Sequence, residues 1–353
     1  MDDEVKVAVG LSGGVDSSVA ALLLKEAGHE VVGVTMKLWR EGRYKGGTRD
    51  ACFGAGEVMD VAQAAALAER LGIPYRAIDC ADAYEREVLG YYRETALSGR
   101  TPNPCVFCNA RMKFGLLPKL ARESGLEFDA FATGHYARIV RRGGRSAVQR
   151  AFDAGKDQSY FLYRLSQEQL ASTLFPLGGL TKREVRAYAR EHGLEMADKP
   201  DSQDFYSGDT DELIGVSDRE GEVVDESGRV IGRHRGYWHY TIGQRKGLGI
   251  ASPNPLYVVR IDACRNRVVL GERASLTTGS FRVEGVNWMA SAETGEPLTC
   301  GVKIRSTGDP RGPVVFQNGI CTAPEGICGV TPGQSAVFYG ADGEILCGGI
   351  ICA

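Results

Sequence analysis

Two cysteines separated by two residues stand out in the segment TPNPCVFCNA, residues 101–110. The spacing of Cys105 and Cys108 suits a metal site, a redox pair or a thiol that carries sulfur, and both residues could equally pack as small hydrophobes. The prolines of this segment disfavour a helix, so a helix is expected to begin near Asn109. Cys108 would then lie at the N-terminal end of that helix, where the thiolate is favoured.

A second stretch with chemical potential is Ser12-Gly13-Gly14-Val15-Asp16-Ser17, which joins a predicted strand to a predicted helix. Glycines there let backbone N–H groups converge on an anion, and the helix N-terminus adds positive potential. Because no Gly-Lys-Ser/Thr follows, the loop is not a Walker loop that positions a γ-phosphate. The carboxylate of Asp16 would help to organise Mg²⁺ and pyrophosphate. The alternative is a tight turn with a Ser or Asp helix cap.

The elements that must hold these residues alternate between strand and helix in the first half of the chain. Strands are predicted at 5–11, 30–38, 75–79 and 128–134, and helices at 17–28 and 56–72. Val58, Val61, Ala65 and Ala68 are expected to share the buried face of the second helix, and Thr181 with Glu184 predicts a capping box. This alternation predicts a doubly wound parallel sheet of the α/β class.

Beyond about residue 206 the sequence becomes rich in short β-type runs, and residues 221–232 and 255–272 are each predicted to form a hairpin. The predicted domains are therefore a nucleotide-binding catalytic domain (1–206), a small β-rich domain (207–275) and a C-terminal β-barrel (276–353).

The 353 residues carry a net charge of −3, so a nucleic-acid partner would require a local basic surface. Candidates for that surface are residues 138–145, 233–235 and 245–246. No apolar run is long enough to span a membrane, and the first residues lack a signal-peptide core, so a cytoplasmic location is expected. Ten cysteines in that compartment should be mostly reduced.

The loop resembles the SGG-x-D-S phosphate loop of the ATP pyrophosphatases, which cleave ATP between its α- and β-phosphates. Further stretches occur in the order found in the tRNA-specific 2-thiouridylases, and the resemblance to that family spans nearly the whole chain. These stretches are GVTMK (33–37), RTPNPCVFCNARMKFG (100–115), FATGHYARI (131–139), GKDQSYFLYRL (155–165), DKPDSQDFY (198–206) and HYTIGQRKGLGI (239–250).

The resemblance implies ATP-dependent adenylation of O2 of the wobble uridine in tRNA, followed by replacement of that oxygen with sulfur. It implies ATP contacts at Gly10, Leu11, Ser12, Gly13, Gly14, Val15, Asp16, Ser17, Met36 and Gly134. It also implies tRNA contacts at Asn103, Pro104, Lys156, Asp157, Gln158, Arg305 and Ser306. Two other functions compete with this one: a different ligase with the same phosphate loop, such as a GMP synthetase, and a metal-stabilised tRNA-binding module without catalysis.

The chain departs from the common family pattern at two positions. Cys105 stands where an aspartate is usual, and Tyr206 stands where a second catalytic cysteine is expected. Cys52, in a glycine-rich segment, could approach Cys105 and Cys108, and three thiolates suit a [4Fe–4S] cluster. Zinc, a Cys105–Cys108 redox pair and simple packing remain alternatives. The sulfur donor would be inorganic sulfide or a persulfide carrier protein. A fourth cysteine of this half, Cys80, is expected in the hydrophobic core.

Overall fold

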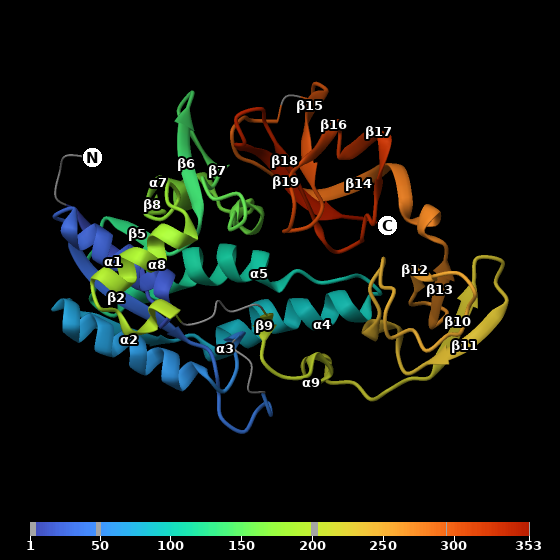
Figure 1. Ribbon diagram of the computed structural model, residues 1–353, viewed down its shortest axis with the longest axis horizontal. Helices are drawn as coiled ribbons and strands as arrows, with labels where there is room; N and C mark the ends of the chain where they lie inside the picture. The colour runs from blue at the N-terminus through green and yellow to red at the C-terminus, as the bar shows by residue number, and fades with distance from the viewer. Residues whose placement is uncertain (1–4, 47–50, 199–203, 294, 353) are drawn as a thin grey trace.

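The computed structural model describes residues 5–46, 51–198, 204–293 and 295–352. Along the chain it consists of a parallel sheet covered by helices, a small four-stranded sheet and a closed barrel, as Figure 1 shows. This order confirms the predicted fold class.

The first sheet has five strands, all parallel, and both of its faces are buried. In order across the sheet these are β4 (Tyr75–Asp79), β2 (Glu30–Lys37), β1 (Lys6–Gly10), β5 (Ala130–Thr133) and β8 (Thr173–Leu174). On β1, Val7 and Val9 pack on one face and Ala8 on the other, and all three are fully buried. A continuous apolar run is typical of a parallel strand that is covered on both sides.

The chain adds β2 and β4 on one side of β1 and later adds β5 on the other side. The direction in which strands are added to the sheet therefore reverses between β1 and β5. In open parallel sheets, ligands bind at the point of this reversal, outside the carboxyl ends of the strands. The topology therefore places a site where β1 and β5 end.

Three helices cover one face of this sheet. They are α1 (Val15–Glu26), α2 (Glu57–Leu71) and α8 (Lys182–Glu191). The predicted capping box is confirmed, since the Thr181 side chain accepts a hydrogen bond from the backbone N–H of Glu184. The predicted buried face of α2 was wrong at Val58, which is 69% exposed, whereas Ala64, Leu67 and Ala68 are buried. At about 100° per residue, Val58 points roughly 120° away from Ala64.

The Cys105 segment is helical from Pro104 onward, so the expected start near Asn109 was wrong. One continuous helical stretch comprises α5 (Pro104–Phe107), the π-helix η2 (Cys108–Leu116) and α6 (Leu117–Glu123). Pro104 is the first helical residue, a position where the missing N–H costs nothing because that group has no partner in the helix. Cys105, not Cys108, therefore lies in the first turn.

The remaining elements of this part connect the sheet to its neighbours. They are β3 (Ala51–Phe53), α3 (Ala81–Tyr84), η1 (Glu85–Leu89), α4 (Gly90–Leu97), β6 (Ala137–Arg142), β7 (Arg145–Arg150), η3 (Ser159–Leu162), α7 (Gln167–Ala171), η4 (Glu195–Asp198) and β9 (Asp204–Tyr206). Cys52 was expected in a loop and instead lies on β3, which pairs in parallel with β9.

Both predicted hairpins of the central part are confirmed, and they form one four-stranded sheet. Its elements are α9 (Thr210–Ile214), β10 (Gly221–Asp225), β11 (Val230–His234), η5 (Tyr237–His239), β12 (Tyr257–Asp262) and β13 (Arg267–Gly271). The Tyr237 hydroxyl donates to the Leu97 carbonyl, which joins this sheet to the end of α4.

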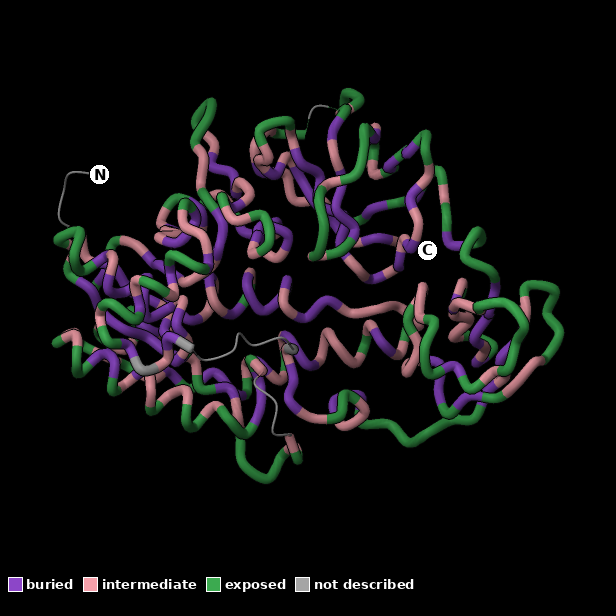
Figure 2. Tube along the Cα trace, viewed as in Figure 1, coloured by how far each residue is buried: buried purple, intermediate pink, exposed green. Residues whose placement is uncertain are grey.

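The C-terminal part is a closed six-stranded barrel that follows η6 (Arg273–Leu276). Its strands are β14 (Thr277–Trp288), β15 (Leu298–Lys303), β16 (Arg311–Gln317), β17 (Ile320–Cys328), β18 (Ser335–Tyr339) and β19 (Ile345–Ile351). Buried positions alternate with more exposed ones along the strands of the barrel, as Figure 2 shows. Met289, Val337, Tyr339 and Ile345 belong to the same buried cluster as Val148 of the first part.

No helix within the described parts of the chain is both long and apolar enough to cross a membrane.

Candidate ATP and sulfur site

A cavity of about 410 Å³ opens at the carboxyl ends of β1, β2 and β5. Its volume is in the usual range for sites that bind small molecules and cofactors. Of the residues singled out from the sequence, the cavity is lined by Gly10, Leu11, Ser12, Gly14, Val15, Asp16, Ser17, Met36, Cys52, Cys108, Gly134, Lys156 and Gln158. The residues that lie outside its lining are Gly13, Asn103, Pro104, Cys105, Asp157, Arg305 and Ser306.

The loop between β1 and α1 has the form of an anion site. Gly14 is the N-cap of α1, and no described side chain caps the helix, so the first-turn N–H groups of residues that line the cavity are left without a side-chain partner. The Ser17 hydroxyl donates to the Gly14 carbonyl at 3.1 Å and accepts from the Ser12 N–H at 3.1 Å, which fixes the loop. Gly13 has φ +70°, and a Cβ there would lie 2.6 Å from the Asp60 carbonyl oxygen.

Asp16 has two protein partners that sequence reasoning missed. The ammonium of Lys182 contacts its two carboxylate oxygens at 2.7 and 2.8 Å, and the Tyr136 hydroxyl donates to Oδ1 at 2.8 Å. Lys182 is the first residue of α8, and the capping box at Thr181 fixes the start of that helix. Lys182 thus neutralises the Asp16 carboxylate in this structure. The role of Asp16 toward Mg²⁺ stays a prediction.

Cys52 and Cys108 line the cavity, and Cys105 lies close to both of them although it is not part of the lining. Cys108 is buried, Cys105 is half-buried and Cys52 is exposed. Burial raises the pKa of Cys105 to about 12, with further upward contributions from Cys52 and Cys108. Burial also raises the pKa of Cys108 to about 11. The helix position that was expected to favour a thiolate at Cys108 was wrong, because the helical stretch begins at Pro104 and Cys108 lies beyond its first turn.

Lys113 is a further cation that lines this part of the cavity and that the sequence did not single out. Burial lowers its pKa, but the nearby Cys52, Cys108 and Cys105 raise it, and the net direction is upward. Cys108 and Lys113 are the first and sixth residues of η2. In an α-helix they would point about 140° apart, whereas the i to i+5 hydrogen bond of a π-helix stacks them on one side.

Tyr206, at the position of the expected second cysteine, belongs to an aromatic core. Its ring packs on Phe53 with centroids 5.7 Å apart, and its hydroxyl donates to the Glu212 carboxylate at 3.1 Å. Phe53 on β3 pairs with Tyr206 on β9. Cys52 is the residue before Phe53 on β3, so it lies one position from the partner of Tyr206. Residues 199–203 of the quoted motif lie outside the described residues.

Cys80, expected in the core, is buried at the end of β4, and burial raises its pKa to about 12. Within the described residues no group of three or more His, Cys, Asp or Glu side chains is arranged to hold a metal ion. The three cysteines at the cavity are thus neighbours without the spacing of a formed metal site.

The residues predicted to contact tRNA occupy different surroundings. Lys156 and Gln158 face the cavity, while Asp157 between them is buried. Asn103 is buried just before α5, where its N–H donates to the Tyr91 hydroxyl at 3.1 Å. Arg305 follows β15 and donates to the Gly329 carbonyl at 3.5 Å, and Ser306 is next to it. These residues do not form one surface at the cavity.

Comparison with known proteins assigns the chain to a family. Residues 5–206 match the tRNA methyl transferase HUP domain, residues 212–272 its PRC-barrel domain, and residues 278–351 the aminomethyltransferase β-barrel domain. The tRNA-specific 2-thiouridylase MnmA of Endomicrobium trichonymphae is 42% identical to this chain, over 99% of the chain and 100% of that protein. The chain belongs to the tRNA-specific 2-thiouridylase family.

Other members of that family match to a similar degree. The protein of the same name from Methylobacterium radiotolerans is 45% identical over 99% of this chain and 94% of its own length. The one from Trichormus variabilis is 43% identical over 98% of both chains. The similarity includes the β-rich second half, where a ligase that shared only the phosphate loop would have no counterpart.

Proposed function

We propose that this chain is a tRNA-uridine 2-sulfurtransferase that consumes ATP. The wobble uridine would attack the α-phosphate of ATP through its O2 and release pyrophosphate. A sulfur nucleophile would then add to C2, and AMP would leave with the original oxygen. The observation that carries the proposal is the full-length match to the tRNA-specific 2-thiouridylases, in a chain whose phosphate loop shares one cavity with Cys52 and Cys108.

The phosphate loop would hold the triphosphate during the first step. The first-turn N–H groups of α1 and the hydroxyl of Ser12 would bind phosphate oxygens, with Met36 against the adenine. The Lys182 ammonium, paired with Asp16, would donate hydrogen bonds where pyrophosphate forms, and Mg²⁺ would supply the net positive charge.

The cysteines would serve the second step. Three cysteine thiolates are a donor set that fits a [4Fe–4S] cluster. Cys52 and Cys108 line the cavity and Cys105 lies close to both, so a shift of their side chains would be needed to bring the three thiols to ligand spacing. When bound, the cluster would supply an iron that carries sulfide. Lys113 would offset the negative charge that three thiolates bring into a buried site.

A persulfide route is the alternative, with Cys108 as the carrier and Cys105 or Cys52 as the thiol that resolves it. Its supporting observation is that Cys108 lines the cavity next to the phosphate loop. Zinc on the same thiols would give a structural site instead. The zinc, iron and acid-labile sulfide content of protein purified without oxygen separates these three cases.

The tRNA is proposed to contact both halves of the chain, through Lys156 and Gln158 at the cavity and Arg305 and Ser306 beside the barrel. The basic hairpin β6–β7 is partly used within the protein, since Arg145 donates to the Trp288 and Met289 carbonyls. Deleting the barrel would expose the apolar cluster that it shares with the first domain. Substitutions in the full chain are therefore the better test of tRNA contacts.

The experiment that tests the proposal measures pyrophosphate and AMP release from ATP, with and without an unmodified tRNA transcript. We expect release that depends on the tRNA. A ligase acting on a small molecule would ignore the tRNA, and a binding module would release no pyrophosphate.

A further inference from the structure

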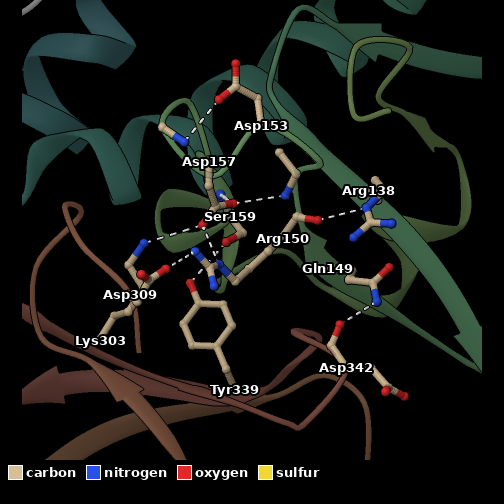
Figure 3. A network of polar contacts seen from close by, with 12 residues as sticks. Arg138, Gln149, Arg150, Asp153, Asp157, Ser159, Lys303, Asp309, Tyr339 and Asp342 are labelled. Atoms are coloured by element: carbon tan, nitrogen blue, oxygen red, sulfur yellow. Dashed lines mark hydrogen bonds and ion pairs between the residues drawn. The ribbon is translucent and has the colours of Figure 1, made fainter. Parts of the chain in front are cut away.

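Asp157 faces away from the cavity that its two neighbours line. Its side chain is 1% exposed and points to the barrel, as Figure 3 shows. Lys156 and Gln158 on either side both reach the cavity. A buried carboxylate between two such residues calls for partners, because an isolated buried charge is costly.

Those partners come from both domains. Oδ1 accepts from the backbone N–H groups of Ala151 at 3.2 Å and Ser159 at 3.1 Å, which shapes the loop itself. Oδ2 accepts from Arg150 at 3.3 Å and from the ammonium of Lys303 at 3.4 Å. Lys303 ends β15 of the barrel and is 3% exposed, so the two domains meet here in a buried ion pair.

Two more barrel residues hold the same loop. The Ser159 hydroxyl hydrogen-bonds to the Tyr339 hydroxyl at 3.1 Å, and both residues are buried. Asp309, after β15, contacts the Arg150 guanidinium at 2.6 Å. Figure 3 shows these contacts converging on the loop from one side of the barrel. The loop is thus fixed by the barrel at several points.

From this loop a chain of hydrogen bonds leads to the phosphate loop. Gln158 exchanges two hydrogen bonds with the backbone of Tyr136, each 2.9 Å long. The Tyr136 hydroxyl in turn donates to Asp16 at 2.8 Å. A contiguous path of buried or half-buried groups therefore joins Lys303 of the barrel to the residue at the start of α1.

We propose that Asp157 is a positioning residue through which the C-terminal barrel holds Lys156 and Gln158 at the cavity in the arrangement that binds ATP. The inference rests on the proposed function for the identity of that ligand. It assigns the barrel a part in nucleotide binding, in addition to any contact with tRNA, and it assigns Asp157 to the protein interior.

The test compares full-length variants by ATP affinity, measured calorimetrically with Mg²⁺, and by thermal unfolding. The main variant is the double substitution Asp157→Asn with Lys303→Met. It removes the charges of Asp157 and Lys303, while the amide oxygen of the substituted side chain takes the place of Oδ1 and can still accept from the two backbone N–H groups. The contact of Arg150 with Oδ2 is lost, but Arg150 keeps Asp309 as its partner. We expect its melting temperature to stay close to that of the native protein and its ATP affinity to fall about tenfold.

Three controls separate positioning from stability. Lys303→Arg keeps the cation and should retain ATP affinity. Val314→Ala, in the barrel core, should lower the melting temperature and leave ATP affinity unchanged. Arg311→Met removes an exposed barrel cation outside the network and should change neither.

Native ATP affinity in the double variant would overturn the inference. An equal loss of affinity in Val314→Ala would do the same, because stability alone would then explain the effect. Failure of the native protein to bind ATP would instead contradict the proposed function, so the two failures are distinguishable.

Discussion

Replacing Gly134 with alanine should disable ATP use by moving the phosphate loop. Gly134 follows β5 and faces the start of α1. A Cβ at this residue would lie 2.6 Å from the Ser17 nitrogen, 2.7 Å from the Asp16 carbonyl carbon and 3.0 Å from the Asp16 Cβ. The first two of these atoms are backbone, so no side chain can rotate away to make room.

The size of the effect follows from those distances. Ordinary contact begins at 3.4 Å, so the start of α1 or the end of β5 must move by about 0.8 Å. A misplacement of about 1 Å in a reacting group can reduce the rate about 100-fold. We expect tRNA-dependent AMP formation by Gly134→Ala to fall about 30- to 100-fold. Overpacking of this kind costs stability of about 1–3 kcal/mol, so the variant should still fold.

The assay is AMP and pyrophosphate formation at saturating and limiting ATP, with thermal unfolding measured in parallel. Gly179→Ala is the matched control, because a Cβ there meets nothing within 4 Å. Native activity and native ATP affinity in Gly134→Ala would refute the reasoning. Equal losses in both variants would show that the defect is not specific to the loop.

Three further predictions follow from the site. Lys182→Met should reduce pyrophosphate release about 10- to 100-fold because it removes the cation 2.7 Å from Asp16. The control variant Arg183→Met, at the next residue, should release pyrophosphate at nearly the native rate. Equal rates in Lys182→Met and the native protein would exclude Lys182 from the site. Alanine at Cys52, Cys105 or Cys108 should abolish thiolation and iron binding, and Cys80→Ala should keep both; loss of both in Cys80→Ala would contradict this ligand set. In metal-free protein, burial raises the pKa of Cys108 to about 11, above the ordinary 9.0, so the free energy of unfolding should fall as pH rises from about 9 toward 11. In urea unfolding, Cys108→Ala should make this dependence on pH less steep. An unchanged dependence would contradict the raised pKa.

Much of the fold could be predicted from the sequence because its signals are local. Apolar runs gave the four long strands of the first sheet, and turn residues gave the hairpins at 221–232 and 255–272. The SGGVDS segment predicted a glycine-rich turn between β1 and α1, which the structure confirms, since its glycines have a direct conformational meaning.

What could not be predicted depends on contacts between distant segments. Lys182 lies 166 positions from Asp16 in the chain, and no local pattern links the two. Lys113 reaches the cysteines because the helix after Cys108 has π geometry, which helical periodicity does not reveal. Asp157 has the polar, charged character of a surface residue in the sequence and is buried by a barrel whose Lys303 lies 146 positions further along the chain. The prolines at 102 and 104 predict that no helix begins in this segment, although Pro104 begins one.

The most direct test of the central claim is nucleoside analysis of tRNA after reaction with the full-length protein. The protein would be reconstituted without oxygen, with iron and sulfide, and incubated with ATP, Mg²⁺, sulfide and an unmodified tRNA transcript that has a wobble uridine. We predict 2-thiouridine at that uridine, formed together with AMP and pyrophosphate and absent without ATP. Release of pyrophosphate that ignores the tRNA, or no thionucleoside from either sulfide or a persulfide donor, would contradict the proposed function.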